Sequence, residues 1–193
     1  MPKAVSYDAG TGEDWRLLLS ACCAMFSMQS IHKANWRFVS ERAIISEDFY
    51  SMLDLFQHLN RVTFIRKVFY HYCENPASLS RTYRADRYQK LRQLAVSMTE
   101  LAEKMNCHIK SEIATMFLNQ LMGALRHIAA CGENLASKMK YIREIVNDPF
   151  LQHVLRSNDF SGDTLTKRAL YWAMRKQSAA LCFLLAFARN LKG

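Results

Sequence analysis

The chain has 193 residues, of which 50% are apolar and 22% are charged, a balance typical of a folded globular protein and not of a disordered one. Glycine and proline are scarce, with 6 and 3 copies, which disfavours an architecture of many short strands and turns. The net charge of +9 favours polyanionic partners such as nucleic acid or anionic lipid, although basic proteins without such partners are common.

Apolar residues recur every three or four positions along most of the chain, which predicts seven helical segments. The first covers about Glu13–His32. The second begins after Ser46, which we expect to cap a first turn that contains Glu47 and Asp48. It continues to Asn75, because the following proline disfavours helical angles at the residue before it.

The third helix is expected to begin near Arg84 and the fourth to cover about 111–130. Asn134 is the predicted N-cap of the fifth, and Asp148 followed by Pro149 predicts the start of a short sixth. The last helix covers about 165–191 and is nearly all-round apolar toward its end, which predicts deep burial or a partner surface. We therefore predict an all-α fold, a single-domain helical bundle of about six to seven helices.

The ends of the chain and its cysteines bear on location. The first residues, MPKAVSYDAGTGED, lack the charged and then apolar order of a secretory signal. The longest apolar run, Ala179–Ala188, is much shorter than the roughly 20 residues of a membrane span. Six cysteines without C-x-x-C spacing indicate reduced, buried thiols. We expect a cytoplasmic protein without a transmembrane segment, with residues 1–12 as an extension ahead of one domain at 13–193.

Metal and catalytic sites are not predicted. His127 and Cys131 stand one helical turn apart, but a structural zinc site needs four ligands, and nothing in the sequence links this pair to Cys107 and His108. No G-x-S-x-G, P-loop, G-x-G-x-x-G or H-E-x-x-H motif occurs. We therefore expect a protein that is not an enzyme, with no catalytic residue, no metal and no cofactor.

Two groups of basic residues are the candidate binding sites. The first comprises Arg81, Arg84, Arg87, Lys90 and Arg92. Its members spread over about half of a helix circumference, and they could hold phosphate oxygens or pair with acids of a neighbouring helix. The second comprises Lys167, Arg168, Arg175 and Lys176 on the last predicted helix. Spacing alone leaves both interpretations open.

Four segments resemble the tumour-necrosis-factor-α-induced-protein-8-like (TIPE) family in their order: SEDFYSMLDLF (46–56), RYQKLRQLAVSMT (87–99), LASKMKYIREIVNDPFLQHVL (135–155) and NDFSGDTLTKRAL (158–170). The interval between residues 54 and 90 is shorter than in the family, and the final apolar helix extends further. The resemblance implies a helical bundle around an apolar cavity for lipid tails, in a cytosolic regulator. It also implies head-group contacts from Arg87, Lys90 and Arg92, which stand at the matching motif.

Three hypotheses of function follow. The first is a non-catalytic cytosolic regulatory protein that binds an anionic ligand, with a phospholipid or phosphoinositide as the best candidate. The second is a helical RNA- or nucleic-acid-binding protein that oligomerises, with a viral origin as one option. The third is a helical adaptor that binds a protein partner, or a second copy of itself, through the apolar C-terminal helix.

Overall fold

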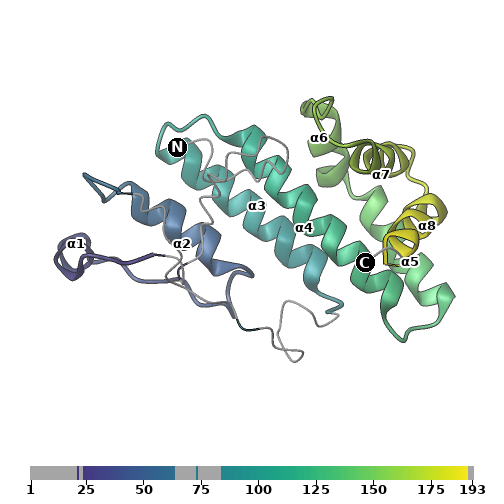
Figure 1. Ribbon diagram of the computed structural model, residues 1–193, viewed down its shortest axis with the longest axis horizontal. Helices are drawn as coiled ribbons and strands as arrows, with labels where there is room; N and C mark the ends of the chain where they lie inside the picture. The colour runs from purple at the N-terminus through teal and green to yellow at the C-terminus, as the bar shows by residue number, and fades with distance from the viewer. Residues whose placement is uncertain (1–20, 22–23, 64–72, 74–83, 191–193) are drawn as a thin grey trace. The chain divides into compact units, whose positions relative to one another are not determined.

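The structure, a computed structural model, describes residues 21, 24–63, 73 and 84–190 (Figure 1). These residues form eight α-helices and no strand, so the all-α prediction is confirmed for this part of the chain, with one helix more than the predicted six to seven. The helices are α1 (Met28–Ala34), α2 (Glu47–Phe56), α3 (Arg87–Lys104), α4 (Lys110–Ala130), α5 (Leu135–Asn147), α6 (Pro149–Ser157), α7 (Leu165–Arg175) and α8 (Ala179–Asn190). Within the described ranges, none of them is long and apolar enough to cross a membrane.

Backbone contacts divide the chain into two compact units. The first unit comprises Met1–Pro76 and Gln89–Phe117, and the second comprises Ala77–Tyr88 and Leu118–Gly193. We describe each unit by itself. The predicted extent of a single domain from residue 13 onward stays a prediction.

The first unit departs most from the predicted helices. Of the helix expected over 13–32, residues 13–20 lie outside the described part, and residues 24–27 are non-helical. Helix α1 begins only at Met28, where the Ser27 side chain caps it by accepting a hydrogen bond from the Ser30 N–H. Ser46 precedes α2 as expected, but its φ of 52° is left-handed and its hydroxyl caps no helical N–H. The α2 helix ends at Phe56, where the backbone N–H of His58 bonds to the Leu55 carbonyl at 2.9 Å, in a turn tighter than α-helical. Residues 57–63 then leave the helix, and 64–72 lie outside the described residues.

Helix α3 begins at Arg87, three residues later than predicted, and α4 begins at Lys110, one residue earlier than predicted. Both helices follow the expected periodicity. The buried side chains of α3 include Leu91, Leu94 and Met98, and those of α4 in this unit include Ile113 and Phe117. Spacing of three and four residues places each set on one helix face, as an amphipathic helix requires.

In the second unit, α5 to α8 pack in a closed cycle: α5 contacts α6 and α8, and α7 also contacts α6 and α8 (Figure 1, green to yellow). The predicted caps are confirmed. The Asn134 side chain accepts a hydrogen bond from the Ser137 N–H at 2.9 Å, and Asp148 accepts one from the Phe150 N–H at 2.7 Å, with Pro149 in the first turn of α6. Buried Gln152 then donates to the carbonyls of Val146 at 2.7 Å and Met174 at 2.9 Å, which ties α6 to the ends of α5 and α7.

The prediction of one last helix over 165–191 is wrong, because two helices stand there. Helix α7 ends in a Schellman motif around Gln177, which has a left-handed φ of 53°. The Gln177 N–H donates to the Met174 carbonyl, and the Ser178 N–H donates to the Ala173 carbonyl. Ser178 then precedes α8 and caps its first turn, since the Ser178 hydroxyl accepts a hydrogen bond from the Leu181 N–H at 3.4 Å. The break turns α8 back so that it can pack on both α5 and α7.

Candidate functional site

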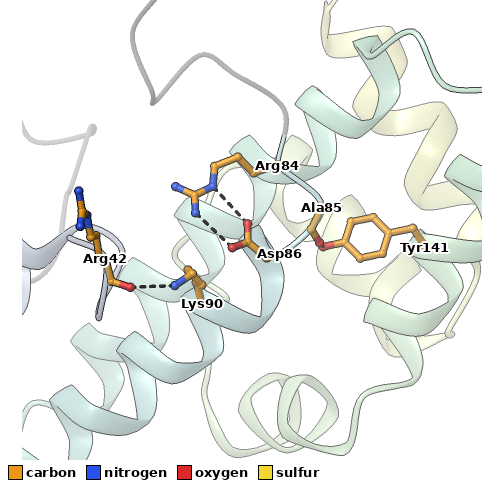
Figure 2. A network of polar contacts seen from close by, with 6 residues as sticks. All are labelled: Arg42, Arg84, Ala85, Asp86, Lys90 and Tyr141. Atoms are coloured by element: carbon orange, nitrogen blue, oxygen red, sulfur yellow. Dashed lines mark hydrogen bonds and ion pairs between the residues drawn. The ribbon is translucent and has the colours of Figure 1, made fainter. Parts of the chain in front are cut away.

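The first basic group is largely occupied by contacts within the chain. Arg81 lies outside the described residues. Arg84 precedes α3 in the second unit and forms a two-pronged pair with Asp86, in which its Nε and a terminal nitrogen each lie 3.1 Å from a carboxylate oxygen (Figure 2). Tyr141 of α5 donates its hydroxyl proton to the Ala85 carbonyl at 2.5 Å, which fixes the same turn. Arg84 therefore has an internal anion as its partner.

Arg87 occupies the first position of α3 and is half-buried. Burial lowers the pKa of its guanidinium, and the nearby positive charge of Arg84 lowers that pKa further. Two guanidinium groups thus lie close enough in the second unit to repel each other. An anion placed beside both would reduce this repulsion, so these two residues are the part of the predicted group that best suits phosphate.

The rest of the first group lies in the first unit. Lys90 donates from its Nζ to the backbone carbonyl of Arg42 at 3.3 Å (Figure 2). Arg92 is exposed on α3. Of this group, Arg87, Lys90 and Arg92 lie on α3 and Arg84 precedes it. Residue spacing could not show that Asp86 and a backbone carbonyl would contact two of these cations.

The second basic group is divided between two faces of α7. Lys167 turns inward to Asp163, with 3.2 Å between its Nζ and the carboxylate oxygen. Arg175 is exposed but donates from its Nε to the Leu155 carbonyl at 3.1 Å. Arg168 and Lys176 are also exposed. Because α7 turns about 100° per residue, Arg168, Arg175 and Lys176 lie within one third of its circumference, together with Trp172, which is 55% exposed.

Helix α8 has an exposed apolar face that covers a little less than half of its circumference. Between Ala179 and Ala188 the sequence has no charged residue, and only Cys182, Ala179 and Ala186 are buried. Four large side chains remain exposed: Leu184 at 58%, Phe187 at 43%, and Leu181 and Leu185 at 37% each. Leu184 and Leu185 are three and four residues after Leu181, and Phe187 is three residues after Leu184, so successive members lie side by side on the helix surface. We call the side chains of Leu181, Leu184, Leu185 and Phe187 the α8 apolar face.

The rest of the fold holds the α8 apolar face in place. Asn190 in the last turn of α8 accepts a hydrogen bond from Arg126 Nε at 3.1 Å and donates one to the Arg126 carbonyl at 2.9 Å. Phe183 stacks on Phe187 with 5.9 Å between ring centroids. Buried Cys182 faces the opposite side, where burial raises the pKa of its thiol to about 12, so that it acts as a small apolar core residue. The exposed leucines are therefore presented by a helix that is anchored at its inner side and at its end.

The histidine and cysteine pairs do not gather into a metal site. Within the described ranges, no group of three or more His, Cys, Asp or Glu side chains could hold a metal ion. The Cys131 thiol lies 3.1 Å from the Ile128 carbonyl as a hydrogen-bond donor. Burial lowers the pKa of His127, and the charges of Arg87 and Arg126 lower it further. Cys73 is exposed, and Cys107 and Cys131 are half-buried, so the expectation of buried thiols is wrong for these three.

A pocket of about 250 Å³ lies in the first unit, lined by Phe26, Met28, Ile31, Trp36, Arg37 and Phe38. Trp36 and Phe38 meet edge to face with 4.6 Å between ring centroids. A second pocket of about 290 Å³ lies along α5 in the second unit and has a mostly polar lining that includes Glu133, Lys138 and Glu144. The lining of the first pocket is apolar except for Arg37, but its volume lies below the roughly 300–1,000 Å³ of pockets that enclose small ligands. Neither pocket is therefore a large apolar cavity.

Comparisons with known proteins give no relative for this chain. No protein-family model matches it. Neither curated proteins nor solved structures give a significant match. The resemblance to the TIPE family therefore stays a prediction that depends on four short motifs, and the function has to be argued from the surfaces described above.

Proposed function

We propose that this protein is a non-catalytic helical binding protein that docks through the α8 apolar face. One observation carries the proposal: four large apolar side chains are 37% to 58% exposed on a helix without a charge between Ala179 and Ala188. Single exposed apolar residues are common on soluble proteins, but a contiguous exposed patch typically marks an interaction surface. This is the sequence-based adaptor hypothesis with its residues now specified.

A photoreactive phenylalanine analogue placed at position 184 tests the proposal in cells. Leu135 provides the matched control position, because it is 59% exposed on α5 of the same unit. Illumination is expected to give a covalent adduct at position 184 and not at position 135, and mass spectrometry identifies the adduct as lipid, protein or a second copy of the chain. Equal adduct yields at the two positions would overturn the proposal.

A second candidate function is the binding of an anionic head group, such as that of a phosphoinositide, beside Arg84 and Arg87. What supports it is the placement of Arg84 and Arg87, both half-buried, at the start of α3, where the positive charge of Arg84 helps to lower the pKa of Arg87. A phosphate would have to compete with Asp86 for Arg84. Replacing Asp86 by Asn is therefore expected to strengthen the binding of a soluble inositol phosphate about threefold to tenfold, because one competing charge is removed. Isothermal titration that finds no gain over the wild type would contradict this candidate.

A further inference from the structure

The charged residues of helices α7 and α8 are all basic. From Leu165 to Asn190 the sequence contains five basic residues and no acidic residue: Lys167, Arg168, Arg175, Lys176 and Arg189. All except Lys167 are exposed. Helices α7 and α8 pack against each other, so this positive charge and the exposed leucines belong to one pair of helices.

This charge distribution discriminates between possible occupants of the face. A second copy of the chain that docked through the same two helices would bring like charges together, which disfavours association. An anionic bilayer offers a partner for both features of helices α7 and α8. The boundary below the head groups can accept the apolar side chains, and the phosphates of the head groups can pair with the basic ones. It also suits Trp172, since tryptophan concentrates at the membrane–water interface.

The length of α8 further limits the geometry of such a contact. At 1.5 Å per residue, its 12 residues extend about 18 Å, which is well short of the roughly 30 Å hydrocarbon core of a bilayer. The buried side of the helix, with Cys182 and Ala186, belongs to the core of the second unit. The helix can therefore lie along a membrane surface but cannot span a membrane.

We propose that the occupant of the α8 apolar face is the surface of an anionic phospholipid bilayer. The four apolar side chains enter the boundary between head groups and acyl chains, while Arg168, Lys176 and Arg189 contact lipid phosphates. This inference depends on the proposed docking function and specifies its partner. It does not require an internal lipid cavity or the Arg84 turn.

Vesicle co-sedimentation of the full chain tests the inference. Vesicles of phosphatidylcholine alone are compared with vesicles that contain 30% phosphatidylserine, each at low and at high salt. We expect at least tenfold stronger binding to the anionic vesicles at low salt, and weaker binding at high salt because surface charges are screened. Equal binding to both vesicle types, or none to either, overturns the inference.

Matched variants separate the apolar contribution from the charge. The double variant Leu184→Gln/Leu185→Gln is expected to lower anionic-vesicle binding at least tenfold, whereas Leu135→Gln leaves it unchanged. The double variant Arg168→Gln/Lys176→Gln is expected to lower binding about tenfold or more, because each surface cation contributes about fivefold. Urea unfolding confirms that all variants remain folded. Unchanged binding by the double leucine variant overturns the inference.

The two proposals fail in different ways. Protein or self adducts at position 184 without vesicle binding overturn the lipid inference and leave the docking function standing. Equal adducts at positions 184 and 135, together with an absence of vesicle binding, overturn both. A third outcome is that the protein binds RNA but not vesicles, and that RNA binding requires Arg168 and Lys176 but tolerates the double leucine variant. This result overturns the lipid inference in favour of a nucleic-acid partner.

Discussion

Helices α6 and α8 belong to the same unit and are similar in length, yet they use their apolar residues in opposite ways. In α6 the residues Leu151, Val154 and Leu155 are all buried, and its exposed positions include polar His153 and Arg156. In α8 the buried residues are small, and the large ones, such as Leu184, are exposed.

This difference shows that a high apolar content does not by itself indicate a core helix. The apolar face of α6 is no wider than its neighbours α5 and α7 can cover. The apolar face of α8 exceeds the area that α5 and α7 can cover, because apolar residues surround the helix. The surplus in α8 is available for a partner, which makes matched substitutions in the two helices informative.

The largest effect on stability is expected for Leu155→Ala in α6. Leu155 is fully buried, so the truncation leaves a cavity and should lower the free energy of unfolding by about 2–5 kcal/mol. Urea unfolding followed by circular dichroism measures the change. A loss below about 1 kcal/mol would mean that α6 is not packed as described.

The next largest effect is expected for Gln152→Met, which keeps the side-chain volume but removes both donated hydrogen bonds. The carbonyls of Val146 and Met174 then lose buried partners, at a cost of about 1–3 kcal/mol. The same urea titration measures it. The Oε1 atom of Gln152 accepts no hydrogen bond from the described residues. A gain in stability would therefore show that burying this atom costs more than the two bonds donated by the Gln152 amide contribute.

A smaller effect is expected for Asp148→Ala. The substitution removes the side-chain cap of α6 and should lower the free energy of unfolding by about 1 kcal/mol. Asp148→Asn is the control, because an amide oxygen can accept the same bond from the Phe150 N–H. Equal losses for both variants would indicate that the charge of Asp148, and not its cap, matters.

The matched counterpart of Leu155→Ala is Leu184→Ala in α8. Because Leu184 is 58% exposed, its truncation should change the free energy of unfolding by no more than about 0.5 kcal/mol, while it weakens vesicle binding. Unfolding and co-sedimentation on the same preparation separate the two properties. A loss of stability comparable to that of Leu155→Ala would place Leu184 in the core and contradict the docking surface.

The smallest effect concerns pH. The pKa of His127 is lowered in the folded protein, so below its usual value of 6.5 the unfolded chain binds more protons than the folded one. The contribution of His127 to stability is therefore fully present above about pH 6.5 and decreases as the pH falls. Urea unfolding at a series of pH values should show a shallower decrease for His127→Gln than for the wild type, and identical slopes would contradict this.

The candidate sites show how far the sequence alone could be taken. The Ala179–Ala188 segment was predicted as buried or as a partner surface, and the structure leaves its large residues exposed because α5 and α7 contact only the opposite side. The Arg84 turn was predicted as an anion site or as an internally paired face. Its pairing with Asp86, two residues away, depends on a local turn that residue spacing does not specify.

By itself the sequence determined the helical class and the start of α6 and of α5. Helical periodicity and side-chain caps depend on residues within a few positions of one another, such as Asp148 and Phe150. Only the tertiary structure decided that the last predicted helix is broken at Gln177 and which side of α8 is covered. Glutamine is not a residue that usually takes a left-handed φ, so here packing across α5, α7 and α8 outweighs local preference, and the same packing leaves the leucines exposed.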